Sequence, residues 1–126
     1  HQGQCPVIFV AEIAVEDQLF TGRAVQPAVI GDFRFQRVPS QARHADLIIH
    51  QLKYPHDDAD LDINVIFPIE RLQELVQEGV LGGLTANFFS FIGYNMDPER
   101  FERTVAADIA RAVAEEGADL ALLAAA

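Results

Sequence analysis

The last third of the chain contains a helix, a glycine and an apolar strand in direct succession. Asp97 and Pro98 are typical of a helix start, because the Asp side chain accepts from free backbone N–H groups and proline needs no hydrogen-bond partner there. Apolar residues then recur every four positions as far as Val113, and Gly117 precedes the run Asp119–Leu123, which we expect to be a buried strand. This succession is the repeating unit of an open parallel sheet. The sequence therefore predicts an α/β fold.

Shorter runs before this unit predict further elements of the same fold. Pro6–Val15 is dense in β-branched residues, which is typical of a strand buried on both faces of a parallel sheet. Further predictions are a loop at Glu16–Pro27, a short exposed strand at Asp32–Val38, brief strands at Leu47–Ile49 and Val65–Phe67, and a helix from Pro68 to Gly79. We expect a three-layer, mostly parallel open sheet, a truncated or minimal form of a Rossmann-like architecture. Residues 1–126 are expected to form a single α/β domain or the N-terminal part of a longer one.

The composition narrows the classes of partner. Half of the 126 residues are hydrophobic, the net charge is −10, and the nine basic residues are scattered along the chain. Nucleic acids and anionic membranes are bound by clustered basic residues, so we expect neither as a partner. The single cysteine, Cys5, cannot form an internal disulfide, and no apolar run reaches the roughly 18 residues of a membrane span. We therefore expect a cytoplasmic protein, and a homo-oligomer if the edge of a short sheet needs cover.

Residues 39–62 form a polar segment that contains three of the four histidines and five aspartates: His44, Asp46, His50, His56, Asp57, Asp58, Asp60 and Asp62. Imidazole and carboxylate groups bind divalent metals, which makes a metal-dependent hydrolase one hypothesis. The spacing, however, matches no closed zinc pattern, so we expect no metal site. Imidazole also titrates near neutrality, so His50, His56 or Asp57 are candidates for a proton donor or acceptor.

Paired glycines occur in the segment Leu81–Thr85, just before an aromatic run at Asn87–Gly93. Their spacing matches neither the dinucleotide-binding nor the phosphate-binding loop, so we interpret them as a tight turn. The three phenylalanines of the aromatic run are expected in the core rather than as a platform for stacking bases. Ser90 lacks the Gly-x-Ser-x-Gly pattern of serine hydrolases, which makes a nucleophilic role for its hydroxyl a weak hypothesis.

Eight short motifs follow one another in a recognisable order: Gly31–Ser40, Ala45–His50, Tyr54–Asp57, Asp62–Pro68, Arg71–Leu75, Glu78–Leu84, Phe89–Gly93 and Ala114–Leu123. This order resembles the selenoprotein B family of glycine, sarcosine and betaine reductases, which also includes D-proline reductase subunits. The likeness covers about three quarters of the chain. The ordered set carries the resemblance, because no single motif is specific enough alone.

The resemblance implies reductive cleavage of a carbon–nitrogen bond in a small amino acid or its N-methyl derivative. In that family a selenocysteine, or a cysteine in relatives, attacks the substrate carbon, and a partner thiol or selenol system supplies the electrons. That nucleophile belongs just beyond the strand represented here by Leu120–Ala124, where this chain has no cysteine. The matching segments contain His50, His56 and Asp57 as catalytic candidates, and Tyr54, Asn64 and Ser90 as substrate-binding candidates.

Two hypotheses follow from the resemblance. The first is the B component of an amino-acid reductase, an oxidoreductase acting on a small amino-acid-like substrate together with a redox partner protein. Its selenocysteine or cysteine is then expected only in a longer native chain, and these 126 residues are expected to hold no cofactor. The second is a non-catalytic α/β binding or assembly module of the same family. The residues that follow Ala126 in the native gene distinguish the two.

Overall fold

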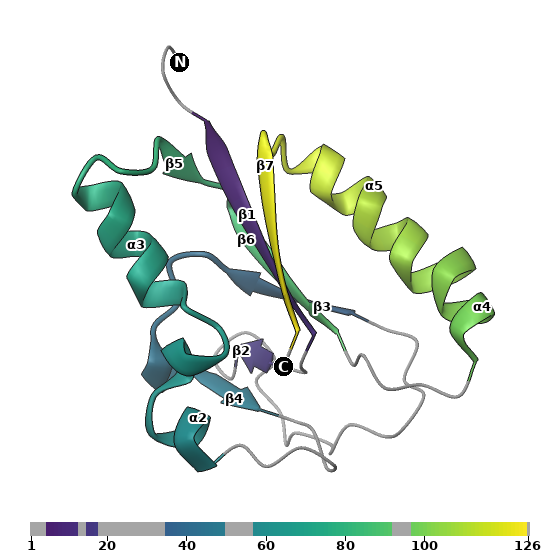
Figure 1. Cartoon of the computed structure of the whole chain (residues 1–126), viewed down its shortest axis with the longest axis horizontal. Helices are drawn as coiled ribbons and strands as arrows, with labels where there is room; N and C mark the ends of the chain where they lie inside the picture. Colours follow the sequence, from purple (N-terminus) through teal and green to yellow (C-terminus); the bar gives the residue numbers. More distant parts are fainter. Residues whose placement is uncertain (1–4, 13–14, 18–34, 50–56, 92–96, 126) are drawn as a thin grey trace.

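A computed structural model describes residues 5–12, 15–17, 35–49, 57–91 and 97–125 (Figure 1). In chain order the elements are β1 Pro6–Glu12, β2 Val15–Asp17, β3 Phe35–Pro39, the 3-10 turn η1 His44–Asp46, β4 Leu47–Ile49, α2 Asp57–Leu61, the 3-10 turn η2 Ile63–Val65, α3 Ile69–Gln77, β5 Gly83–Leu84, β6 Asn87–Phe91, α4 Pro98–Phe101, the π-helical segment η3 Glu102–Ala106, α5 Ala107–Glu115 and β7 Leu120–Ala125. None of the described helices is both long enough and apolar enough to cross a membrane.

The main sheet is built around β1. This strand runs parallel to β5, β6 and β7, whereas β3 pairs antiparallel with β6. Because β6 and β7 both pair with Val10 and Ala11, they lie on opposite sides of β1. The strand order is therefore β3–β6–β1–β7, with β5 beside the start of β1. β2 and β4 form a separate antiparallel ribbon. The predicted α/β fold with an open, mostly parallel sheet is confirmed.

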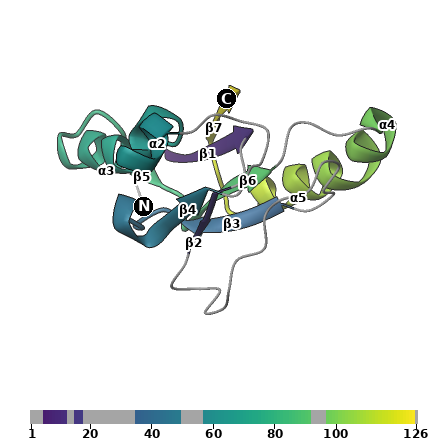
Figure 2. The same cartoon turned by 90° about the horizontal axis from the view of Figure 1, so that it is seen from below.

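Helices cover the two faces of this sheet. Figures 1 and 2 show α3 on one side and α4 with α5 on the other. On the α3 side, the ring of Phe9 lies 5.2 Å from that of Phe67 and 6.3 Å from that of Phe88, in edge-to-face arrangements. On the other side, Phe91 of β6 lies 5.3 Å from Phe101 of α4. Aromatic rings, buried on the α3 side and half-buried on the α4 side, thus pack between the sheet and the helices and produce the three predicted layers.

Both predicted helices form, and each ends where its glycine was expected to end it. Gly79 after α3 and Gly117 after α5 have φ angles of 80° and 74°, the left-handed conformation that commonly follows a helix. At the start of α4, the carboxylate of Asp97 accepts the N–H of Arg100 at 3.0 Å, as the N-cap prediction requires. The π-helical segment η3 separates α4 from α5. The four-residue apolar period did not reveal it.

Several brief elements differ from their predictions. Val65–Phe67 is not a strand, because the carboxylate of Asp62 accepts the N–H of Asn64 and starts the 3-10 turn η2. A short apolar run fits a strand and a turn equally well, so its period did not decide between them. The glycine-rich segment contributes strand β5 as well as a bend. β2 begins at Val15, the last residue of the predicted strand, and continues to Asp17 in the predicted loop. The brief strand Leu47–Ile49 is confirmed as β4, and β3 lies within one residue of its predicted end.

Strand β7 forms where it was predicted but is not buried. Its only neighbour among the described strands is β1, along six register pairs from Val7–Leu120 to Glu12–Ala125. The side chains of Leu120, Leu122 and Leu123 are 51%, 39% and 76% exposed. Within these 126 residues the strand is therefore not buried as predicted, because burial depends on neighbours that the local sequence does not specify.

Candidate functional site

The carboxyl ends of three parallel strands lie at one edge of the sheet. β1 ends at Glu12, β6 at Phe91 and β7 at Ala125, and Figure 1 shows all three ends at its lower side. In open α/β sheets, ligands bind outside the carboxyl ends of the strands. This edge is therefore where the fold favours a functional site.

Ser90 lies one residue before the end of β6 and is completely buried. It is paired in the sheet register with Gln36 of β3, and its hydroxyl donates a hydrogen bond of 3.1 Å to the side-chain oxygen of Gln36. The hydroxyl thus takes part in a contact between strands inside the sheet. Its predicted role in substrate binding remains a prediction.

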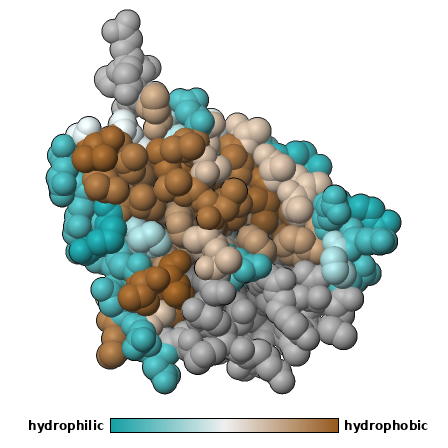
Figure 3. All heavy atoms as spheres, viewed as in Figure 1, coloured by the Kyte–Doolittle hydropathy of each residue, from teal (hydrophilic) through white to brown (hydrophobic). Residues whose placement is uncertain are grey.

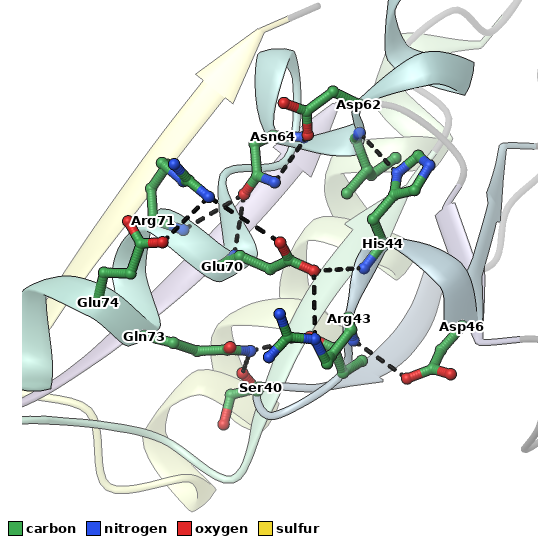
Figure 4. A network of polar contacts seen from close by, with 12 residues as sticks. Ser40, Arg43, His44, Asp46, Asp62, Asn64, Glu70, Arg71, Gln73 and Glu74 are labelled. Atoms are coloured by element: carbon green, nitrogen blue, oxygen red, sulfur yellow. Dashed lines mark hydrogen bonds and ion pairs between the residues drawn. The ribbon is translucent and has the colours of Figure 1, made fainter.

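Asn64 is the cap of helix α3. The N-cap position of α3 is Pro68, whose side chain has no hydrogen-bond acceptor, so the first N–H groups of the helix need another partner. The side-chain oxygen of Asn64 accepts the N–H of Glu70 at 2.9 Å and that of Arg71 at 3.3 Å. Its amide nitrogen donates to a carboxylate oxygen of Asp62 at 2.8 Å (Figure 4). This substrate-binding candidate therefore has a structural role in the described part of the chain.

His44 and Glu70 connect the segment after β3 to helix α3. The carboxylate of Glu70 accepts the backbone N–H of His44 at 2.8 Å and lies 3.7 Å from the guanidinium of Arg43. The Nδ1 atom of His44 accepts the N–H of Ile63 at 2.9 Å, so a neutral imidazole carries its hydrogen on Nε2. Figure 4 shows these contacts converging on the start of α3. His44 is thus held as a hydrogen-bond acceptor between two turns.

A second connection lies one turn further along α3. The side-chain nitrogen of Gln73 donates to the carbonyl oxygens of Ser40 at 2.9 Å and Ala42 at 2.8 Å. The sequence interpretation identified neither this residue nor Glu70. Their only sequence signal is a position on the polar side of a predicted helix, which is shared by many residues without such a role.

Hydrogen bonds within its own turn shift the pKa of Asp62. The hydrogen bond from the Asn64 side chain, followed by that from the Asn64 backbone N–H, lowers the pKa of Asp62 below its ordinary value of 3.8. Both bonds are made to the ionised carboxylate, so they favour the charged form. This residue is fully exposed, and the shift therefore reports a local turn rather than a buried catalytic acid.

The remaining candidates are not gathered into one site by the described residues. Asp57 is exposed at the first position of α2, while His50, Tyr54 and His56 lie outside the described residues. Within the ranges that the structure describes, no group of three or more His, Cys, Asp or Glu side chains could hold a metal ion. Cys5 is a free, exposed thiol just before β1.

A curated relative covers most of the chain. D-proline reductase subunit gamma from Acetoanaerobium sticklandii is 35% identical to it over 93 residues, which are 74% of this chain and 38% of the relative. This chain belongs to the proline/glycine reductase family. The resemblance inferred from the ordered motifs is confirmed. The reductase-family match spans little more than a third of the relative's length. No known family profile and no solved structure matches the chain.

Proposed function

We propose that this chain is the α/β part of a reductase subunit that cleaves a carbon–nitrogen bond of a small amino acid, with D-proline as the first substrate to test. The observation that carries the proposal is the 35% identity to D-proline reductase subunit gamma over 93 residues. The parallel arrangement of β1, β6 and β7 supports it, because three carboxyl ends meet at the edge where open α/β sheets bind ligands.

The proposed chemistry needs a nucleophile and an electron donor. A selenol or thiol attacks the α-carbon of D-proline, the bond from this carbon to the ring nitrogen breaks, and the nitrogen takes a proton. A thiol of a donor dithiol then attacks the selenium or sulfur, so that the carbon leaves with a proton as 5-aminopentanoate. The second donor thiol releases the nucleophile and closes the donor disulfide. The reaction consumes two electrons and two protons, all supplied by the dithiol and water.

The nucleophile is proposed to follow β7 in the natural polypeptide. A side chain just after Ala125 would stand at the carboxyl edge, beside the ends of β1 and β6. The relative is named as a subunit, so we propose protein partners that include the dithiol donor. Cys5 is not proposed for this role, because it lies before β1 and therefore at the opposite end of the strands.

A non-catalytic binding or assembly module of the same family is the second candidate function. The observation that favours it is the exposed apolar strand β7, a surface suited to contact with another polypeptide segment. In that case the family fold is retained without the redox residue. This candidate predicts binding to other reductase components without turnover.

The test begins with the natural polypeptide, as encoded by its reading frame, purified together with the reductase components that accompany it. It is incubated with D-proline and dithiothreitol, and 5-aminopentanoate is measured by mass spectrometry, with glycine, sarcosine and betaine in parallel. In deuterated water the product should carry one deuterium at the former α-carbon. Replacement of the cysteine or selenocysteine after β7 by alanine should abolish turnover.

Cys5→Ser is the matched control, because it removes a thiol at the opposite end of the strands without touching the proposed site. Its turnover should equal that of the parent. Product formation that depends on Cys5, or a natural polypeptide that lacks any thiol or selenol after β7, would reject the proposed chemistry. Retained binding to the reductase components would then support the assembly module.

A further inference from the structure

Strand β7 has exposed leucines on both faces of the sheet, and only Ala124 packs against the core. In the parallel register Leu122 lies beside Phe9, which packs against Phe67 on the α3 side. Leu123 lies beside Val10, whose other neighbour, Phe89, faces the opposite side. Exposure of 39% for Leu122 and 76% for Leu123 therefore means that the helices leave this strand incompletely covered on both faces.

The exposed strand is part of a larger hydrophobic surface. Figure 2 shows β7 at one edge of the sheet, and this edge faces the viewer in Figures 1 and 3. In Figure 3 hydrophobic atoms extend from β7 toward the end of α3, where Val80 is 66% exposed. β7 itself contains only leucine and alanine. Edge strands that remain at a surface are usually blunted by charged residues or proline, and β7 has neither.

A second copy of this chain would not cover this surface fully. Two β7 strands paired edge to edge would satisfy the unpaired backbone N–H and C=O groups of their edges. The leucine side chains on both faces of each strand would still be exposed. A strand buried in a parallel sheet needs helices above and below it as well as a neighbour at its side. The required occupant is therefore a segment that contains both helix and strand.

We infer that β7 is an inner strand of the complete sheet, and that a helix-and-strand segment following Ala126 in the natural polypeptide packs against it. One strand–helix–strand unit takes about 30 residues. The relative is long enough for several, because the matched 93 residues are 38% of its length. The inference depends on the fold and the family, and not on the proposed reaction.

The test compares the same substitution in two lengths of the protein, the 126-residue chain and the product of the natural reading frame. Leu123→Lys should change the Tm of the 126-residue chain by less than about 2 °C, because the side chain is already in water. In the natural polypeptide it should lower the Tm by more than about 5 °C, because the lysine would be buried between a helix and the sheet. Leu61→Lys is the control, since Leu61 is 82% exposed on α2, and its effect should be small at both lengths.

Leu123→Ala keeps the test decisive if the lysine variant of the natural polypeptide fails to fold. It introduces no charge, and its Tm loss should also be larger in the natural polypeptide than in the 126-residue chain. Equal small effects at both lengths would overturn the inference, as would a reading frame that stops at Ala126. A dimeric 126-residue chain that Leu123→Lys converts to a monomer would overturn it in favour of a second copy. Only the length-dependent loss supports it.

Discussion

Replacement of Asn64 by alanine should destabilise the chain by uncapping α3. The substitution removes the acceptor for the N–H groups of Glu70 and Arg71, while Pro68 at the N-cap position provides no substitute. Loss of a helix cap typically costs about 1 kcal/mol, within a range of roughly 0.5–2. Two N–H groups lose their partner here, but the second bond is long at 3.3 Å. We therefore expect a loss of about 1–2 kcal/mol.

Thermal unfolding followed by circular dichroism at pH 7 measures this loss. At this chain length 1 kcal/mol corresponds to about 4 °C, so the Tm of the Asn64→Ala variant should fall by about 4–8 °C. Asn64→Asp keeps an acceptor oxygen near the helix N-terminus, where negative charge is favourable, and should lose less. It also places a second carboxylate beside Asp62, so some loss should remain.

Gln77→Ala is the control at the other end of α3, where the residue is exposed. Its free energy of unfolding should change by less than about 0.5 kcal/mol. If the Asn64→Ala variant were as stable as this control, the cap described here would contribute nothing, and the reasoning would be refuted.

Further predictions concern the same polar network. The pKa of Asp62 is lower in the folded chain than its ordinary 3.8, so the unfolded chain binds this proton more tightly. The carboxylate therefore contributes stability above pH 3.8 that is lost as the pH falls through the lowered folded pKa. NMR titration should show the Asp62 pKa rising toward 3.8 in the Asn64→Ala variant, and an unchanged value would contradict this cause. Glu70→Ala should cost about 1–3 kcal/mol in urea unfolding, because the N–H of His44 loses its acceptor. Glu70→Gln keeps an acceptor oxygen and should cost less, and equal losses would assign the stability to the Arg43 ion pair instead.

The sequence predicted those parts of the fold that depend on local signals. The caps at Asp97 and Pro98 and the stops at Gly79 and Gly117 act within one turn of helix, so their residue types alone locate the helix ends. The apolar run of β1 likewise marks a central strand, because both of its faces are covered. The family resemblance required the order of many motifs, none of which is specific alone.

Features that depend on distant residues were not predicted. The role of Asn64 as a cap arises because Pro68 leaves the first N–H groups of α3 without a partner, and an upstream side chain folds back to them. A proline at the start of a predicted helix, with asparagine a few residues before it, is a usable signal for this arrangement. The exposure of β7 depends on which segments neighbour it, and no local pattern encodes that. The roles of His50, Tyr54 and His56 remain predictions.

The pairing of β1 with β7 has a consequence for synthesis of the chain. Val7 pairs with Leu120, so β1 leaves the ribosome roughly 110 residues before β7, the strand with which it forms the most register pairs. At a translation rate of about 5–20 residues per second, β7 is synthesised about 5–20 s after β1. During this time the apolar side chains of β1 lack the cover that β7 provides. Contacts between such distant segments also close slowly, because a long loop must be ordered first. The nascent chain is therefore expected to bind molecular chaperones through residues 6–12 until β7 has emerged.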